Sequence, residues 1–252
     1  MARSKYYNST TQQWEYADRN PLPTGQNGDI LVNENGVWVA KPKWRMSFQL
    51  VEWIESVPSS SGPYIDTGYV PTSKTVIEAE VAFTDSSETA GKYMGMRHWK
   101  TTSDTRALFF GRRYSNNTPS LALFTMYPEA TPEQIEYDSD FHHYLITPTL
   151  QKIDDNEFHL NYSTFPDDET LSFILFGLHA YYENQQYPSV EVNLVRCKLK
   201  YLRIKEGDIL VRNFIPVYDI YTGEIGVYET VGDRFYGNEV TNGSFNKGAD
   251  VN

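Results

Sequence analysis

Residues 76–83 read Val76-Ile77-Glu78-Ala79-Glu80-Val81-Ala82-Phe83. The odd-numbered side chains of this stretch are all apolar, and Glu78 and Glu80 fall between them. Because successive side chains of a β-strand point to opposite faces, the pattern places an apolar row on one face and both carboxylates on the other. The stretch therefore predicts a half-buried antiparallel strand whose acidic face meets water.

Short β-rich runs recur from Phe48 to the end of the chain. They are separated by clusters of Gly, Pro, Asn, Asp and Ser, and a helical period of 3.6 residues is almost absent. Further strands are expected at 92–96, 107–110, 121–126, 141–147, 157–162, 172–178, 190–204, 209–215 and 226–229. So many short strands predict an all-β fold of two packed antiparallel sheets.

Two local irregularities are expected within this pattern. The alternation changes phase at Tyr201-Leu202, which indicates a β-bulge or a strand that passes from one sheet edge to the other. Thr131-Pro132, followed by Glu and Gln, is typical of a helix N-terminus and predicts one short helical turn over 131–136. Cys197 lies in an apparent strand, and we expect it to be a small buried hydrophobe.

Residues 1–47 differ from the rest of the chain. They are rich in Asn, Thr, Gln and Gly, and they hold three of the five tryptophans. Residues 28–39 predict a hairpin with its turn at 33–36, but a lone hairpin is marginal in water. The sequence therefore predicts an extended N-terminal arm at 1–47 and one β domain at 48–252. The aromatic residues expected to bury the arm against a partner are Tyr6, Tyr7, Trp14, Tyr16, Trp38 and Trp44.

Composition and charge narrow the classes of partner. With 252 residues, 40% of them hydrophobic and 15% aromatic, the chain has enough apolar material for a real core. The formal net charge of −11 opposes binding to nucleic acid, because that binding needs a basic face. No apolar run approaches the roughly 20 residues that span a bilayer, and no secretory signal is expected at the N-terminus.

Aromatic and basic residues indicate a candidate ligand site. His98-Trp99, near Arg97 and Lys100, is expected to form an exposed platform on a loop, since aromatic rings stack on sugar faces and basic side chains hold acidic groups. Ordinary loop residues are the alternative interpretation. The further candidate stacking residues are Tyr181, Tyr182 and Tyr187.

Metal binding is not expected from the spacing of the candidate ligands. His142 and His143 would point to opposite faces of a strand, so they cannot jointly bind one metal ion. Acidic groups occur at 138/140, 154–155 and 167–169, and carboxylate oxygens are the ligands that Ca²⁺ prefers. None of these groups has the regular spacing of a calcium loop. We therefore expect no cofactor and no metal, with Ca²⁺ as the one ion left open.

Catalysis is not expected either. Glu78 and Glu80 would lie about 7 Å apart on one strand face, which falls within the range of a glycosidase carboxylate pair. Any alternating acidic strand gives that spacing, however. The motifs of serine hydrolases, zinc proteases, P-loop enzymes and dinucleotide-binding enzymes are all lacking from the sequence. The sequence therefore predicts a protein that is not an enzyme.

Two longer motifs carry a resemblance to a known family. The stretch 52–56, Glu-Trp-Ile-Glu-Ser, followed by Tyr64-Ile65-Asp66-Thr67-Gly68-Tyr69, resembles the opening of LamG-like jelly-roll domains in phage and prophage virion proteins. Residues 212–218, 222–238 and 243–248 are similar to the closing motif of the same domains. The resemblance spans about residues 48–252 and implies a laminin-G/concanavalin-like jelly-roll sandwich. Within the closing motif, the expected core residues are Phe214, Ile215, Val227, Tyr228 and Phe235.

The resemblance also implies a function. Tyr6-Tyr7-Asn8 and residues 28–32 are similar to N-terminal segments of phage fibre proteins that dock on a capsid or tail. We therefore expect a virion structural protein, a head or tail fibre assembled in the host cytoplasm as a homotrimer. Residues 1–47 would bind other virion proteins, and the jelly roll would contact host-surface or environmental glycans. The alternatives are a carbohydrate-binding module outside a virion and a concanavalin-like glycoside hydrolase.

Overall fold

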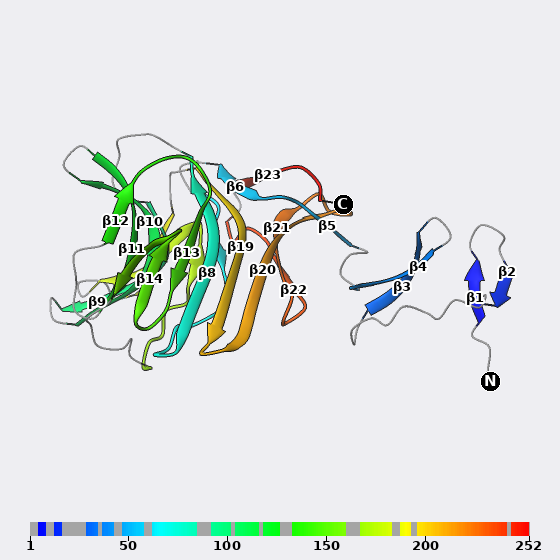
Figure 1. The fold of residues 1–252 in the computed structure, drawn as a ribbon, viewed down its shortest axis with the longest axis horizontal. Coiled ribbons are helices and arrows are strands. Elements are labelled where there is room, and N and C mark those ends of the chain that lie inside the picture. Colours follow the sequence, from blue (N-terminus) through cyan, green and yellow to red (C-terminus); the bar gives the residue numbers. More distant parts are fainter. Residues whose placement is uncertain are drawn as a thin grey trace. The chain divides into compact units, whose positions relative to one another are not determined.

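A computed structural model describes the chain in fourteen segments, and every regular element in them is a β-strand (Figure 1). The described residues are 5–8, 13–16, 29–34, 37–42, 47–57, 62–84, 92–101, 104–115, 118–126, 133–159, 167–182, 187–192, 196–240 and 243–251. The chain divides into two compact units, Met1–Met46 and Ser47–Asn252. Within the described part, no helix is long and apolar enough to cross a membrane.

The first unit contains two antiparallel hairpins. β1 (Lys5–Asn8) pairs with β2 (Gln13–Tyr16), and β3 (Asp29–Glu34) pairs with β4 (Val37–Pro42). Glu34 lies opposite Val37, so the predicted hairpin is confirmed. The anchor candidates Tyr6, Tyr7, Trp14, Tyr16 and Trp38 lie on these strands, whereas Trp44 lies outside the described residues.

The second unit contains two sheets, and the larger one is antiparallel. Its strand order is β15-β14-β13-β8-β19-β20-β21-β22, with β5, β6 and β23 attached through β19 and β20. The strands are β5 (Phe48–Leu50), β6 (Ile54–Val57), β8 (Thr75–Phe83), β13 (His142–Ile146), β14 (Leu150–Ile153), β15 (Asn156–His159), β19 (Cys197–Glu206), β20 (Ile209–Asp219), β21 (Ile225–Glu229), β22 (Arg234–Tyr236) and β23 (Ser244–Lys247).

The smaller sheet has the order β12-β11-β10-β9-β16-β7. β17 also pairs with β9, and this contact is parallel, whereas β18 pairs antiparallel with β17. The strands are β7 (Ile65–Asp66), β9 (Lys92–Thr101), β10 (Asp104–Ser115), β11 (Thr118–Met126), β12 (Glu133–Glu136), β16 (Ile174–Leu175), β17 (Gly177–Tyr182) and β18 (Ser189–Val192).

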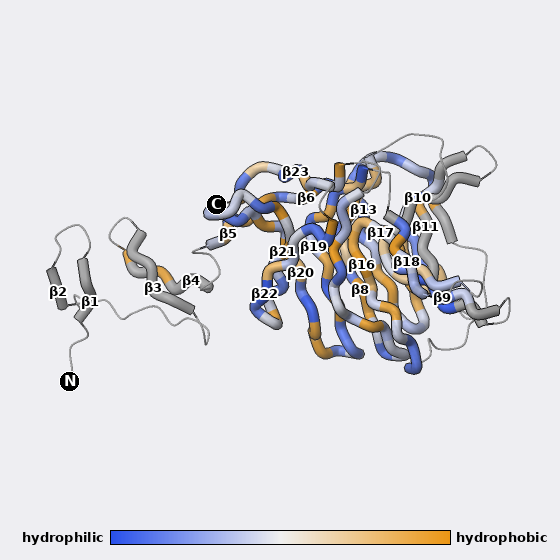
Figure 2. Tube along the Cα trace, turned by 180° about the vertical axis from the view of Figure 1, so that it is seen from behind, coloured by the Kyte–Doolittle hydropathy of each residue, from blue (hydrophilic) through white to orange (hydrophobic). Residues whose placement is uncertain are grey.

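The core lies between the two sheets. The apolar row of β8 is fully buried, and the hydrophobic segments of the second unit are concentrated in its strands (Figure 2). Met94 and Met96 of β9 face this row from the smaller sheet. The ring of Tyr144 stacks on Phe110 at 4.9 Å between centroids and so joins β13 to β10. Burying each large apolar side chain contributes about 2 kcal/mol, so the core between the two sheets is the main source of stability.

Two expectations about local structure are wrong. Residues 133–136 form β12 at the edge of the smaller sheet rather than a helical turn, because pairing with β11 outweighs the helix-start pattern. The predicted strand at 190–204 is two strands, β18 and β19, which belong to different sheets. The predicted irregularity in β19 is confirmed one residue earlier, since its register against β8 shifts between Leu199 and Tyr201.

The closing motif is a packing motif. Phe214, Val227 and Tyr228 are buried as expected, but Ile215 and Phe235 are only half-buried, because Ile215 points to the opposite face of β20 from Phe214 and Phe235 lies on the edge strand β22. The sequence pattern did not indicate the role of Glu229. Its buried carboxylate accepts hydrogen bonds from the backbone N–H groups of Asn213, Val231 and Gly232, at 3.0, 2.8 and 2.6 Å. The carboxylate thereby fixes the turn that joins β21 to β22 against β20.

β9 and β10 approach each other closely at Gly95. Its φ is +140°, and a Cβ built there would clash with the carbonyl oxygen of Leu108 and lie 2.6 Å from the Cβ of Phe109. We expect Gly95→Ala to destabilise the second unit by about 3 kcal/mol or more, since backbone atoms of β10 would have to move.

Gly207→Ala provides the matched control for that substitution. Gly207 also has a positive φ, +60°, but nothing lies within 4 Å of its built Cβ. The alanine there should cost only the strain of the left-handed conformation, about 1 kcal/mol. Urea unfolding of both variants measures the difference, and equal losses would contradict the close approach at Gly95.

Candidate functional site

The structure brings four of the five predicted ligand residues together. The parallel pairing of β17 with β9 places Tyr181 opposite His98 and Tyr182 opposite Trp99. The expectation that His98 and Trp99 lie on a loop is wrong, because β9 continues through them and pairs with β10 on one edge and β17 on the other. Tyr187 lies before β18 and is 71% exposed, and no contact joins it to the other four within the described residues.

The pleat of β9 separates these residues onto two faces. His98 alternates with Trp99, so His98 follows Met94 and Met96 on the core face, and its ring meets the edge of Tyr181 at 5.1 Å. Trp99 and Tyr182 lie on the other face, with ring centroids 6.4 Å apart. The predicted platform is therefore divided, and only its Trp99–Tyr182 half faces away from the core.

Two charged residues complete this outer half. The guanidinium of Arg97 lies 4.3 Å from the centroid of the Trp99 ring. The Tyr182 hydroxyl donates to Oε1 of Glu191 at 2.6 Å, and Arg97 also hydrogen-bonds that hydroxyl. We refer to Arg97, Trp99, Tyr182 and Glu191 as the outer cluster. The sequence pattern indicated Arg97 as a neighbour of Trp99 but not Glu191, which reaches the cluster only through β17–β18 pairing.

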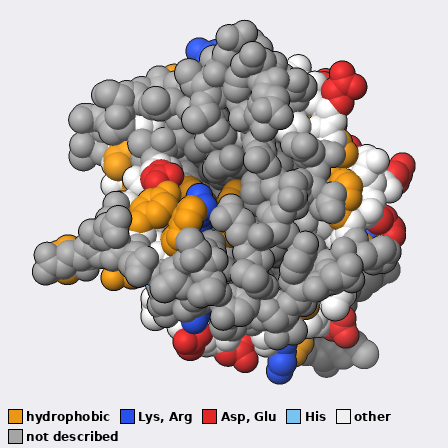
Figure 3. All heavy atoms as spheres, turned by 90° about the vertical axis from the view of Figure 1, so that its left-hand side faces the viewer, with side chains coloured by type: hydrophobic (Ala, Val, Ile, Leu, Met, Phe, Trp, Pro, Cys, Tyr) orange, Lys and Arg blue, Asp and Glu red, His pale blue; other side chains and the backbone are white. Residues whose placement is uncertain are grey.

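Exposure of the outer cluster is graded. Phe109 and Leu178, on the same face nearer the middle of the smaller sheet, are each 3% exposed, whereas Arg97, Trp99 and Tyr182 are half-buried and Glu191 is exposed. Seen from the side on which β9 lies in Figure 1, hydrophobic, basic and acidic side chains lie close together on the surface (Figure 3). The cluster is thus part-sheltered and part-open, as a surface ligand site requires.

The Tyr182 hydroxyl remains protonated, and so remains a hydrogen-bond donor, at neutral pH. Burial raises the pKa of Tyr182 to about 12, and the hydrogen bond to Glu191 acts in the same direction, whereas Arg97 lowers it. The hydroxyl therefore keeps its proton at neutral pH and continues to donate to the Glu191 carboxylate.

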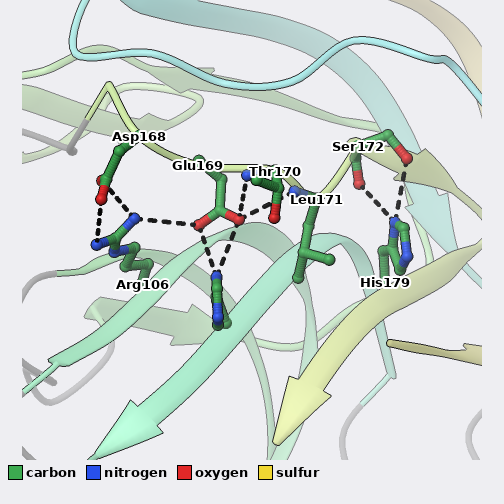
Figure 4. A network of polar contacts seen from close by, with 8 residues as sticks. Arg106, Asp168, Glu169, Thr170, Leu171, Ser172 and His179 are labelled. Carbon is green, nitrogen blue, oxygen red and sulfur yellow. Dashed lines mark hydrogen bonds and ion pairs between the residues drawn. The ribbon is translucent and has the colours of Figure 1, made fainter. Parts of the chain in front are cut away.

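A buried polar network lies on the core face behind the outer cluster (Figure 4). The side chain of Glu169 is fully buried, and its Oε1 accepts from the backbone N–H groups of Thr170 and Leu171 at 2.7 and 2.9 Å. His98 Nδ1 lies 3.0 Å from the same oxygen. Because a carboxylate only accepts, Nδ1 must carry the proton. His98 Nε2 is buried without a hydrogen-bond partner in the described part of the chain.

Arg106 connects this network to β10. It lies opposite His98 in the β9–β10 register, and its guanidinium donates to both carboxylate oxygens of Asp168 at 2.6 and 3.3 Å. Asp168 and Glu169 were considered above only as calcium ligands. Instead Glu169 binds His98 of β9 and Asp168 binds Arg106 of β10, so the segment before β16 is held to both strands. Because His98 points inward, its neighbours Arg97 and Trp99 lie on the outer face.

The other acidic groups also have protein partners. Asp138 and Asp154 both bind His142, at 2.8 Å to Nε2 and 2.6 Å to Nδ1. His143 lies on the opposite face, as predicted, and contacts Glu78 at 3.4 Å. No group of three or more His, Cys, Asp or Glu side chains in the described segments is arranged to hold a metal ion.

The carboxylates considered for glycoside hydrolysis lie on the larger sheet, in ion pairs. Glu78 contacts Arg203 at 3.3 Å and His143 at 3.4 Å, and Glu80 contacts Lys200 at 2.5 Å. Both side chains are half-buried on the outer face of β8, so the strand alternation predicted there is confirmed. Cross-strand pairing with basic residues accounts for these two glutamates.

Comparisons of this chain with family models, curated proteins and solved structures found no match. The likeness to LamG-like virion domains therefore rests on the two sequence motifs. The all-β arrangement of two packed sheets rests on the structure itself.

His142 makes stability depend on pH. Burial lowers the pKa of His142, but its hydrogen bonds to Asp154 and Asp138 outweigh burial, and the net pKa is raised above the ordinary 6.5. A raised folded-state pKa gives stability that is fully present below about pH 6.5 and is lost as pH rises through the folded pKa. The stability difference between wild type and His142→Gln should therefore shrink from about pH 5.5 to about pH 9.

Chemical unfolding of both proteins across that range measures the effect. The lower limit keeps Asp138 ionised, since a backbone N–H from Asp140 and the contact with His142 lower the pKa of Asp138 below 3.8. A difference that stays constant with pH would show that His142 does not gain a proton between the two carboxylates.

Proposed function

We propose that this protein is a virion appendage of a bacterial virus, a head or tail fibre whose jelly-roll domain contacts glycans through the outer cluster. The observation that carries the glycan contact is the convergence of Trp99, Tyr182, Arg97 and Glu191 on one surface. The virion context follows from the motifs at 52–69 and 212–248, whose likeness is to LamG-like domains of virion proteins.

The chemistry of the outer cluster suits a sugar. Tyr and Trp rings offer an apolar body that packs on the C–H face of a pyranose and a polar group that stays wet. Arg97 supplies donors, and the Glu191 carboxylate supplies acceptors beside the rings. Sugars need this combination, because each ring carries apolar C–H faces and a rim of hydroxyls.

The position of the cluster in the second unit supports an appendage. β5, where this unit begins, is bound to β20 of the larger sheet, whereas β9 and β17 belong to the smaller one. Figures 1 and 2, seen from opposite directions, both show β5 and β9 on opposite sides of the sandwich. The cluster therefore lies on the side of the second unit opposite the strand at which this unit begins.

The binding proposal is tested by substituting one ring. Trp99→Ala should weaken binding to a glycan microarray at least tenfold, the usual size for loss of a central aromatic contact. Tyr221→Ala is the matched control, because Tyr221 is 76% exposed in the β20–β21 turn, and it should leave binding unchanged. Equal effects of the two substitutions would contradict a glycan site at the cluster.

The virion proposal has its own test. Electron microscopy of intact particles, with an antibody against the 47–252 fragment, should label projections from the head or the tail. Unlabelled particles together with intact glycan binding would favour the alternative, a carbohydrate-binding module that acts outside a virion.

Self-association is the remaining part of the proposal. We expect residues 1–47 to hold copies together as a homotrimer, since short hairpins rich in Trp and Tyr are not stable alone in water. Light scattering should then give an oligomer for the full chain and a folded monomer for residues 47–252. An oligomeric fragment would move the interface to the sandwich.

A further inference from the structure

The outer cluster carries information on the class of sugar, provided that the proposed glycan site is correct. Three features bear on it: Arg97 covers one face of the Trp99 ring, Tyr182 connects Arg97 to Glu191, and a ligand meets the charges of the cluster and of the chain.

The Trp99 ring is already stacked on one side. The Arg97 guanidinium lies 4.3 Å from its centroid, within the range of a cation–π contact. A ligand therefore cannot stack on that face without displacing Arg97. The contact keeps the guanidinium beside the ring, and a guanidinium carries five N–H donors, so a ligand next to Trp99 can accept a hydrogen bond from it.

The Tyr182 hydroxyl stands between a donor and an acceptor. It hydrogen-bonds Arg97 and donates to Glu191 Oε1 at 2.6 Å. Glu191 is exposed, and Tyr182 is the sole partner of its carboxylate among the described residues. The second carboxylate oxygen is thus placed to accept from a ligand. The cluster offers charged donors on one side of a hydroxyl and a charged acceptor on the other.

Charge decides between ligand classes. An anionic sugar would form an ion pair with Arg97, but Glu191 and the chain's net charge of −11 would repel it. A sugar with two neighbouring hydroxyls meets both groups, because one hydroxyl can accept from Arg97 while the other donates to Glu191. Hydrogen bonds to ionised partners are about twice as strong as neutral ones.

We infer that the outer cluster binds neutral sugars through adjacent hydroxyl groups, held between Arg97 and Glu191 beside the Tyr182 ring. Glu191 is the specificity residue, since it favours hydroxyl donors and disfavours carboxylate-bearing sugars. The inference rests on the proposed glycan-binding function.

The experiment compares two polysaccharide probes on the full chain by calorimetry. Wild type should bind dextran, which is neutral, more tightly than polygalacturonate, which is acidic. Glu191→Gln should weaken dextran binding roughly tenfold or more, the size expected for losing a charged hydrogen bond, and should strengthen polygalacturonate binding. Tyr182→Phe keeps the ring and removes the bridging hydroxyl, and should also weaken dextran binding.

Glu52→Gln is the matched control. Glu52 is exposed next to β6 of the larger sheet, so its substitution changes the net charge equally but leaves the cluster intact. It should alter neither affinity. Tighter binding of polygalacturonate by wild type, or unchanged dextran binding in Glu191→Gln, would overturn the inference while leaving a glycan site in place. No binding of wild type to either probe or to the microarray would overturn the proposed function, and the inference with it.

Discussion

The arrangement of the second unit depends on the close approach of β10 to β9 at Gly95. No side chain fits there, because a Cβ would meet the backbone of Leu108 and Phe109. At this residue β9 also pairs with β16 and with β17, from a different part of the chain. Antiparallel and parallel pairing therefore meet at one glycine. The parallel register that includes Gly95 also places residues 97–99 beside residues 180–182 of β17.

From that junction outward, the two faces of β9 have different roles. On the core face, the Glu169 carboxylate is satisfied by two backbone N–H groups and His98, so it is a fully bonded anchor. On the other face, Arg97 and Trp99 contact Tyr182 of β17, which bonds Glu191 of β18, and Arg97, Trp99 and Tyr182 are only half-buried. Because successive side chains of β9 point to opposite faces, the contacts on the core face also determine which side chains lie on the outer face. A slip of one residue in the register would exchange the two faces.

Sequence reasoning succeeded where structure is local and failed where it is not. The alternation at 76–83 and the hairpin at 28–39 involve neighbouring residues, and both were predictable. Trp99 and Tyr182 were named from composition, but their meeting requires parallel pairing between segments about eighty residues apart, which no local pattern contains. Glu169 and Glu229 were missed as anchors because a buried carboxylate and a solvated one look alike in sequence. The helix expected at 131–136 failed because edge pairing was not foreseeable.

Substitutions in the inward-facing network and in the outer cluster have different effects on the fold. Removing Glu169 would leave the buried N–H groups of Leu171 and His98 without an acceptor, which destabilises the fold. Glu191 is exposed and bonds only through a tyrosine hydroxyl among the described residues, so its replacement leaves no buried group unsatisfied. Residues 97, 182 and 191 on the outer surface can therefore be substituted while the inward-facing network keeps β9 in register.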